Sequence, residues 1–464
     1  MNIMLVQPNS ASAVKTVIGT TGVPLSLAYL GAALREEHEV RIIDALTLDY
    51  GTEELKGELK KHEPDVVGIT ATTPAIYGAY DVARLAKEFN PDVKTVIGGP
   101  HATFTANGTL DECPELDVVV RHEGEHTFKE LADAFENGTP LKNIAGICFR
   151  ENGGIKETEG RPYIKNLDEI PFPAYDLLPM NEYRLGDRRY GMMMTSRGCP
   201  YDCIFCASSL LCGKKWRARS AENVIEELRM LKDEFGVREI EFMDDTFTLS
   251  NTRANEICDM IIGDNLDISW SCSAHANTID YKLANKLKKA GCHDIFIGAE
   301  SGSQRILDFI GKSTTLARIE KAVETTKRAG LNTLASFILG VPGETRAMIK
   351  DTIKFARKLN PKYAQFTLCT PYPGTRLFEL AKEKGMLISS DWRRYTTVEP
   401  IMNIPGITAE ELKKLFNWAY ISFYLRPSFV FSELINRRTF LVKKAISSVY
   451  TYYRTDRKVK KESL

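Results

Sequence analysis

The chain has 464 residues, enough for about two to four domains, and its hydrophobic content of 43% can fill the cores of such domains. Its 61 basic and 61 acidic side chains balance, which excludes a global charge that would favour nucleic acid as a partner. Ten cysteines without the pattern of a secreted disulfide protein, and the lack of an apolar run of about 18 residues, favour a cytoplasmic protein without a spanning helix.

Residues 1–143 are expected to form a doubly wound domain, because strand-like apolar runs alternate with helical patterns. Its first segment, Met1–Pro8, is too short and uncharged for a signal peptide and is expected to be a strand. Alternation of this kind produces a parallel sheet with helices on both faces. The expected strands are Ile3–Val6, Val40–Ile43, Val66–Thr70, Thr95–Ile97 and Val118–Val120, and the expected helices are Pro24–Glu37, Thr52–Lys61, Ala75–Phe89 and Glu125–Phe135.

Small and polar residues collect at the carboxyl ends of these strands, where doubly wound sheets bind their ligands. Glycines at these positions allow a bulky ligand to approach the backbone. None of the segments has the G-x-G-x-x-G pattern, which argues against a nicotinamide dinucleotide. The candidate binding residues are Gln7, Thr70, Thr72, Thr73, Gly98, Gly99, His101, Glu123 and Gly124.

Residues 144–189 are expected to link this domain to a second one. Ile144–Arg150 and Pro162–Lys165 flank Glu151-Asn-Gly-Gly154, which is typical of a β-hairpin with an Asn-Gly turn. Three prolines between positions 171 and 179 then stiffen an extended connector.

Three cysteines, Cys199, Cys203 and Cys206, follow an expected strand at Tyr190–Met194 with C-x3-C-x2-C spacing. Soft thiolates on a loop suit an iron–sulfur cluster or zinc. A closed structural zinc site needs four ligands, but the next cysteine, Cys212, is six residues further on and no histidine is close. A zinc knuckle or buried free thiols therefore explain the spacing poorly. Three ligands on a four-iron cluster would instead leave one iron open to bind a small molecule. The seven other cysteines are expected to be small core residues.

With Phe205 before its last cysteine, this segment resembles the radical SAM superfamily. A doubly wound domain ahead of such a loop resembles the cobalamin-binding domain of the B12-dependent radical SAM family, and Gly98-Gly-Pro-His101 and Glu123-Gly-Glu125 look like loops of that family. The resemblance covers most of the chain. It implies a 4Fe-4S cluster on the three cysteines, S-adenosylmethionine (SAM) and cobalamin as cofactors.

The sequence departs from many cobalamin proteins in the residue expected to ligate cobalt. The sequence lacks D-x-H-x-x-G, which supplies a lower axial histidine in many cobalamin proteins, so cobalamin is expected to bind without that ligand. His101 is expected to be a loop or capping histidine rather than a cobalt ligand. The alternative is a scaffold that packs on the second domain without a corrinoid.

Residues 190–394 show about six further strand–helix units and resemble the partial (β/α)6 barrel of radical SAM enzymes. Sites in such barrels lie at the carboxyl ends of the strands. After Tyr190–Met194, the expected strands are Glu239–Met243, Ser269–Ser273, Asp294–Ala299, Thr333–Leu339 and Tyr363–Cys369, and the expected helices are Ala221–Glu234, Arg253–Asp264, Tyr281–Ala290, Thr315–Ala329 and Arg346–Leu359.

Polar residues again follow these strands. The resemblance implies that Glu300 accepts hydrogen bonds from the ribose or the methionine ammonium of SAM, and that backbone groups near Gly340–Gly343 contact adenine. Asp244 and Asp245 could instead be capping, metal or acid–base carboxylates, and His275 a structural histidine. Tyr372 is a candidate substrate contact. The candidate SAM-binding residues are Asp244, Asp245, His275, Glu300, Ser301, Gly340 and Gly343.

Residues 395–464 are expected to form a helical C-terminal domain with helices at about Ala409–Leu425 and Phe429–Tyr453. The second is rich in aromatic and basic residues, so it either lies on an anionic membrane as a peripheral contact or packs on the barrel. Similar Arg-Pro segments occur in relatives that act on hopanoids and bacteriochlorophyll precursors, which points to an apolar or lipid-like small-molecule substrate.

The resemblance implies an anaerobic, cobalamin-dependent radical SAM enzyme that adds a methyl group to an unactivated carbon, through a 5′-deoxyadenosyl radical and methylcobalamin. A reductant such as ferredoxin or flavodoxin would supply electrons. One alternative is an oxidative cyclase or rearrangement enzyme of the same architecture. The other is a non-catalytic iron–sulfur protein acting in electron transfer or sensing.

Overall fold

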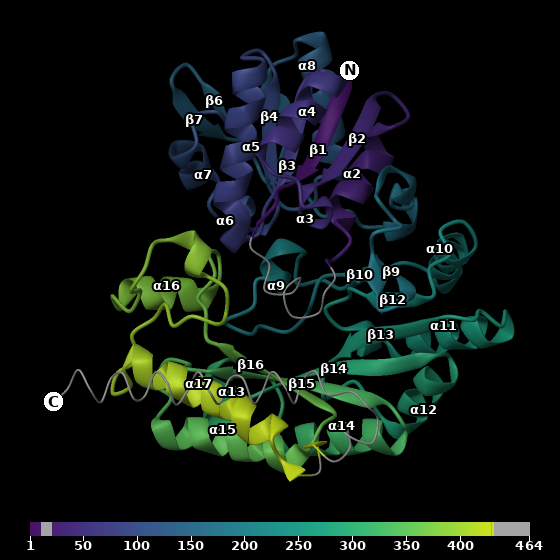
Figure 1. Ribbon diagram of the computed structural model, residues 1–464, viewed down its shortest axis with the longest axis vertical. Helices are drawn as coiled ribbons and strands as arrows, with labels where there is room; N and C mark the ends of the chain where they lie inside the picture. Colours follow the sequence, from purple (N-terminus) through teal and green to yellow (C-terminus); the bar gives the residue numbers. More distant parts are fainter. Residues whose placement is uncertain (11–20, 428, 431–464) are drawn as a thin grey trace.

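The computed structural model describes residues 1–10, 21–427 and 429–430 and contains two α/β domains, one above the other in Figure 1. In the described part, no helix has the length and apolar character needed to cross a membrane. The second expected tail helix, Phe429–Tyr453, lies outside the described residues except for its first two positions.

The first domain contains a seven-stranded sheet whose order is β2-β1-β3-β4-β5-β6-β7. The strands from β2 to β5 are parallel, as the alternating pattern predicts, and β6 and β7 add an antiparallel hairpin at the edge beyond β5. The hairpin expected in the linker is therefore part of this sheet, but its second strand is Gly154–Glu157 and not the expected Pro162–Lys165. The strands are β1 (Asn2–Gln7), β2 (Glu39–Asp44), β3 (Val66–Thr70), β4 (Lys94–Gly98), β5 (Val118–Val120), β6 (Ile147–Glu151) and β7 (Gly154–Glu157).

Helices cover both faces of this sheet, which is the doubly wound arrangement. Leu27 of α2 and Phe128 of α8 pack in one core, and Leu59 of α4 and Ala79 of α5 pack in the other. The helices are α2 (Leu25–Leu34), α3 (Ala45–Leu48), α4 (Thr52–His62), α5 (Ile76–Phe89), α6 (Pro100–Phe104), α7 (Ala106–Glu112) and α8 (Glu125–Asn137).

Helix α2 is shorter than the expected Pro24–Glu37. It ends at Leu34, whose carbonyl accepts hydrogen bonds from the backbone amides of Glu37 at 3.2 Å and His38 at 3.0 Å. These bonds close a turn that leads directly into β2, so the last three polar residues leave the helix.

The second domain contains a curled sheet of order β16-β15-β14-β13-β12-β9-β8 that does not close on itself, as expected for a partial barrel. All its strands are parallel except the short β8. The strands are β8 (Arg184–Leu185), β9 (Arg188–Met193), β12 (Glu239–Phe242), β13 (Ser269–Ala274), β14 (Cys292–Glu300), β15 (Asn332–Leu339) and β16 (Tyr363–Leu368), with a separate pair β10 (Ser196–Arg197) and β11 (Arg217–Ala218).

Most helices of this domain begin at a residue whose side chain caps them, which explains their well-defined starts. Ser220, Ser250, Asp280, Thr315 and Thr345 each accept a hydrogen bond from a backbone amide of the first turn. The helices are α9 (Ser208–Leu211), α10 (Ala221–Asp233), α11 (Asn251–Gly263), α12 (Tyr281–Lys289), α13 (Gln304–Phe309), α14 (Leu316–Arg328), α15 (Arg346–Leu359), α16 (Arg376–Glu383) and α17 (Ala409–Tyr424).

Helix α17, the first expected tail helix, covers the open edge of the curled sheet. The hydroxyl of Tyr424 accepts from the amide of Ala364 and donates to its carbonyl, and Tyr420 does the same at Phe366. Backbone groups of edge strand β16 that lack a neighbouring strand are thereby satisfied.

Candidate active site

The loop that carries the three cysteines, residues 198–207, lies at the mouth of the curled sheet and faces the first domain. We call it the cysteine loop. The amide of Cys199 donates to Gly213 at 3.2 Å and that of Ile204 donates to Ile310 at 3.0 Å. Gly198 has φ +89°, and a Cβ there would meet the Lys215 carbonyl oxygen at 2.6 Å, so only glycine fits. The loop is thus anchored on both sides.

The thiols of this loop suit a polynuclear cluster better than one ion. All three cysteines are free and partly exposed. Within the described residues, their sulfur atoms do not gather within 4.8 Å of one another, as ligands of one ion would. A four-iron cluster binds each thiolate at a different iron and so needs wider spacing. Burial raises the pKa of the Cys203 thiol to about 11, and the Lys312 ammonium opposes this shift.

A cavity of about 230 Å³, here called the mouth cavity, lies at the carboxyl ends of the curled sheet's strands. Of the expected SAM-binding residues, Asp245, His275 and Glu300 line it. Ser301, Asp244, Gly340 and Gly343 do not. The other lining residues are Thr246, Ser273, Ala274, Phe296, Ile297, Gly298, Lys312, Leu334, Ser336 and Gln365.

Glu300 forms a buried ion pair with Lys312, with 2.7 Å between Oε1 and Nζ. It lies where the register of β14 against β15 shifts, and it has φ +59°. A Cβ on Gly298 would meet the Glu300 carboxylate at 2.2 Å, so this glycine makes room for the pair. Lys312 was missed by the sequence reasoning, because it sits in a loop after α13 with no motif around it.

Asp244 has a different role from the expected one. It is 2% exposed and accepts from the Thr195 amide at 2.7 Å, the Thr195 hydroxyl at 2.6 Å and the Ser196 hydroxyl at 2.5 Å. Its carboxylate therefore fixes the chain just before the cysteine loop. Burial raises the pKa of its neighbour Asp245, which faces the mouth cavity.

His275 is held by both ring nitrogens. Its Nδ1 accepts from the Asn277 amide at 3.2 Å, so Nε2 carries the proton and donates to the Lys312 carbonyl at 3.2 Å. Burial, assisted by the Lys312 charge, lowers the pKa of His275 to about 4, which keeps the ring neutral. The ring stacks on Tyr201 of the cysteine loop, with 4.0 Å between centroids. His275 therefore offers the cavity a neutral surface.

The remaining expected SAM residues lie outside the mouth cavity, and hydrogen bonds hold them in place. The Ser301 hydroxyl accepts from the Ser303 amide at 3.1 Å and contacts Thr352. Glu344, which follows Gly343 in the same strand-end segment, accepts from the amides of Gly340 at 2.7 Å and Val341 at 3.1 Å, and burial raises its pKa to about 7. The turn at Gly340 is thus held in place, and its contact with adenine stays a prediction.

A second cavity of about 220 Å³, here called the junction cavity, lies between the two domains. Strand ends of the first sheet form one wall, through Thr70, Gly98 and Gly99, and the segment Glu123–Glu125 adjoins them. Leu25, Ser26, Tyr29 and Leu30 of α2 form a second wall. Met194, Arg197, Leu211 and Cys212 of the second domain close the cavity.

Two features of the junction cavity suit a cofactor that bears amide groups. A Cβ on Gly124 would come within 3.2 Å of Leu30, so the glycine keeps this wall open. Glu125 Oε2 is buried without a hydrogen-bond partner among the described residues, and it can accept from a ligand amide. These features fit cobalamin, with Thr70, Gly98, Gly99, Glu123, Gly124 and Glu125 as the residues that would hold it.

The other candidates from the first domain lie elsewhere. Gln7, Thr72, Thr73 and His101 do not line the junction cavity. His101 is 1% exposed, places Nδ1 3.3 Å from the Thr73 hydroxyl and packs edge-on against Trp392. It is therefore a structural residue. His122, which was not proposed, does line the cavity, and only its position in the strand-end segment 121–125 could have indicated this.

A buried ion-pair network joins the two domains beside this cavity. Arg197, two residues before Cys199, contacts Glu125 at 2.6 Å and Glu123 at 3.2 Å, and Arg217 contacts Glu123 at 2.9 Å. Burial works to raise the pKa of Glu125, but the Arg197 charge outweighs it and holds that pKa below its usual value. The network therefore fixes the start of the cysteine loop against the first domain.

The segment 197–212 connects the two cavities. Arg197 and Cys212, near its two ends, line the junction cavity. Asp245 and Lys312 line the mouth cavity, and their charges act on Cys199 in the middle of the segment. A three-cysteine loop at the mouth of a partial barrel, under a doubly wound domain, defines the class of radical SAM enzymes with a cobalamin-binding domain.

Comparison with known proteins agrees with this class. The B12 binding domain matches residues 11–132, and the Radical SAM superfamily matches residues 193–356. An uncharacterized methyltransferase of Pyrococcus horikoshii is 51% identical over 98% of this chain and 99% of its own length. An anaerobic magnesium-protoporphyrin IX monomethyl ester cyclase of Rubrivivax gelatinosus is 30% identical over 95% of this chain and 81% of its own length.

Among solved structures, the radical SAM methyltransferase TsrM of Kitasatospora setae, with cobalamin and a 4Fe-4S cluster bound, has the same fold. It matches with a TM-score of 0.74 at 17% identity, over 92% of this chain and 89% of TsrM. The chain belongs to the cobalamin-dependent radical SAM enzymes, and its cofactors are a 4Fe-4S cluster, SAM and cobalamin.

Proposed function

We propose that this enzyme transfers a methyl group from SAM to an unactivated carbon of a small molecule. The observation that carries the proposal is the placement of the mouth and junction cavities on two sides of one cysteine-bearing segment, 197–212. When bound, the three cofactors supply the radical chemistry and the methyl group. The relative of 51% identity is named a methyltransferase, which supports this reaction type.

The chain's own residues hold and order these groups. Cys199, Cys203 and Cys206 would bind the cluster, and the buried ammonium of Lys312 would offset the negative charge of its thiolates. Glu300 and Asp245 would contact SAM in the mouth cavity. The residues of the two domains that enclose the junction cavity would restrict water around the reacting groups.

The substrate would enter the mouth cavity, whose walls mix polar and apolar groups. Ser273, Ser336 and Gln365 offer hydrogen bonds, and Phe296 and Leu334 offer apolar contact. Eight of the thirteen lining residues are polar or charged, so the cavity favours a substrate with several polar groups, and a lipid-like substrate rests on the family resemblance alone. Tyr372, the candidate substrate contact, donates its hydroxyl to the Tyr395 carbonyl at 2.9 Å and does not line the mouth cavity.

Oxidative cyclisation is the second candidate, because the cyclase from Rubrivivax gelatinosus is 30% identical over most of the chain. Anaerobic incubation of the cluster- and cobalamin-loaded protein with methyl-labelled SAM and a strong reductant separates the two. A methyltransferase places label on the bound corrinoid and also forms 5′-deoxyadenosine. Formation of 5′-deoxyadenosine without labelled corrinoid would favour cyclisation and contradict the proposal.

Two partners complete the proposed function. A low-potential ferredoxin or flavodoxin of the cytoplasm would reduce the cluster. The tail beyond Arg426, which carries many basic and aromatic residues and lies largely outside the described residues, would contact an anionic membrane if the substrate is lipid-like. Cosedimentation with anionic vesicles that weakens as salt rises supports this contact, and no cosedimentation at low salt would refute it.

A further inference from the structure

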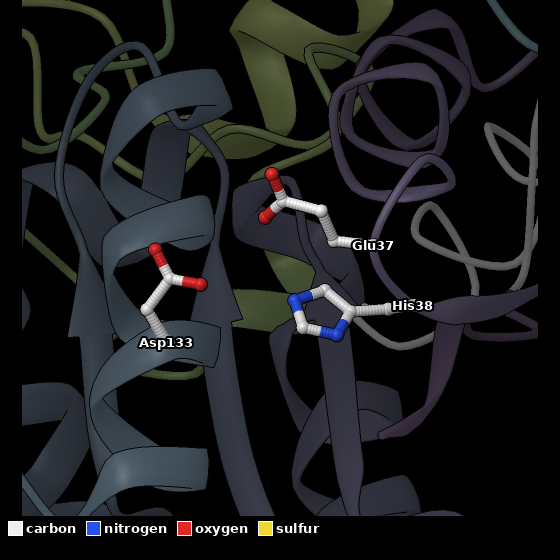
Figure 2. Close-up of side chains that lie close together, drawn as sticks. All are labelled: Glu37, His38 and Asp133. Carbon is white, nitrogen blue, oxygen red and sulfur yellow. The ribbon is translucent and has the colours of Figure 1, made fainter.

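A group of three potential metal ligands lies on the first domain, apart from both cavities. Glu37 and His38 belong to the turn between α2 and β2, and Asp133 belongs to α8 (Figure 2). One ligand atom from each residue lies within 4.8 Å of the others. Among the described residues, no other group of three or more histidine, cysteine or carboxylate side chains meets this spacing.

The histidine of this group is the unusual member. His38 is only 7% exposed, yet neither Nδ1 nor Nε2 has a hydrogen-bond partner in the described part of the chain. A buried imidazole that leaves both nitrogens unpaired costs free energy. Figure 2 shows its ring facing the space between the two carboxylates. Its position is fixed by the backbone bond from the His38 amide to Leu34 at 3.0 Å.

We propose that Glu37, His38 and Asp133 bind one divalent metal ion, and that zinc is the ion that fits best. One imidazole and two carboxylates form a donor set that zinc accepts, with metal–ligand distances of about 2.0–2.2 Å and a water molecule in the fourth position. The two carboxylates are accessible to solvent, so small side-chain rotations can bring their oxygens to the ion. Binding would satisfy one of the orphaned nitrogens of His38.

One cation already competes for the site. Lys129, also on α8, contacts Glu37 Oε1 at 2.9 Å, and this ion pair holds the pKa of Glu37 below its usual value. The pair is exposed and therefore weak. Since Lys129 uses one oxygen of the carboxylate, the other remains for the metal.

The metal site would connect α2 and α8, two helices that line the junction cavity. Leu25 and Leu30 of α2 and Glu125 and Phe128 of α8 line the junction cavity, whereas the proposed ligands lie just beyond the last residue of α2 and in the later part of α8. A metal ion there would clamp α2 to α8 and stabilise the walls of the cavity from outside it.

Zinc binding to the cluster-loaded protein tests the proposal, because an assembled cluster keeps zinc off the three cysteines. After incubation with zinc and desalting under anaerobic conditions, wild type should retain one zinc ion that His38→Gln and Asp133→Asn lose. Loss of even an outer-shell partner weakens metal sites by about 10–100-fold, so loss of a ligand should weaken zinc affinity by about a hundredfold or more. Asp133→Asn is nearly isosteric at an accessible position, so it keeps the test valid if His38→Gln folds poorly.

Three control variants separate this site from ordinary surface binding. His62→Gln removes a partly buried His62–Glu58 pair on α4, and Glu130→Gln removes a carboxylate one turn before Asp133 on α8. Both should keep the zinc ion. Lys129→Gln should bind zinc at least as tightly as wild type, because it removes the competing cation. Equal zinc content in wild type, His38→Gln and Asp133→Asn would overturn the proposal, as would a wild type that retains no zinc.

Discussion

Cys212 is a natural comparison for the three cysteines of the cysteine loop. All four are free and partly exposed, but Cys212 lines the junction cavity rather than the barrel mouth. We expect alanine at Cys199, Cys203 or Cys206 to abolish both the iron–sulfur absorbance and SAM cleavage, because each thiolate would hold one iron. Cys212→Ala should keep the iron content of wild type. If Cys212→Ala also loses its iron, the ligand assignment is wrong.

Glu300 is expected to bind SAM through its carboxylate while Lys312 holds it in position at 2.7 Å. Charge-assisted hydrogen bonds contribute about 1.5–3 kcal/mol, so Glu300→Gln should weaken SAM affinity by about ten- to a hundredfold. Equilibrium dialysis with SAM and an iron assay on the same sample measure this. Glu324→Gln, at an exposed position on α14, is the control and should match wild type. SAM affinity unchanged in Glu300→Gln would refute the role.

His101 should make the stability of the protein depend on pH. Burial lowers its pKa from 6.5 to about 4, so below pH 6.5 the unfolded chain binds a proton that the folded chain does not. Stability is therefore lost as pH falls from about 6.5 to about 4, and this residue accounts for about 2 kcal/mol between pH 7 and pH 5. Urea unfolding at pH 7 and at pH 5 measures the free energy of unfolding at each pH. The loss of this free energy between the two pH values should be smaller in His101→Gln than in wild type by about 2 kcal/mol. If His101→Gln loses as much unfolding free energy between pH 7 and pH 5 as wild type does, His101 is not the buried neutral histidine that we infer.

At the scale of elements, the link between β10 and the start of α8 is one buried contact that joins the domains. Replacing Arg197 by methionine leaves the buried Glu125 carboxylate unpaired, which should cost about 3–5 kcal/mol and reduce cobalamin retention. Arg35→Met is a matched control, because the Arg35–Asp176 pair is half-exposed and its loss should cost less than about 1 kcal/mol. Denaturant unfolding measures both variants. Equal losses would show that the network does not join the domains.

The sequence predicts the elements well where a local pattern decides them. Alternating apolar runs identify β1 to β5 and the parallel strands of the barrel, and helical patterns identify α10 and α15. The pairing of β6 with β5 has no local pattern, because it depends on an edge that only the folded sheet exposes. The turn after Leu34 has the same cause: hydrogen bonds at the sheet entry override a helical composition.

The residues of the candidate active site also fall into those that a local pattern predicts and those that depend on long-range contacts. Spacing alone indicates Cys199, Cys203 and Cys206, and strand-end positions indicate Glu300 and Gly99. Lys312, Tyr201 and His122 contribute through contacts between loops that are far apart in the chain, which no spacing records. Asp244 and Ser301 stand at strand ends but satisfy backbone groups of the loops instead of facing the cavity.

At the scale of the whole molecule, both cavities and the cysteine loop belong to one assembly. The carboxyl ends of both sheets meet at the domain junction, where α9 lies between the domains in Figure 1. The matches to B12 binding and Radical SAM models cover the two halves of this arrangement in the same order. A cofactor in the junction cavity would therefore lie next to the segment that carries the cluster.

The central claim is that one chain holds both a four-iron cluster and a cobalamin. Metal analysis of anaerobically reconstituted, desalted wild-type protein tests it most directly. We expect about four iron atoms and about one cobalt atom per chain in the same sample. Protein that retains iron but no cobalt after loading with cobalamin would contradict the claim.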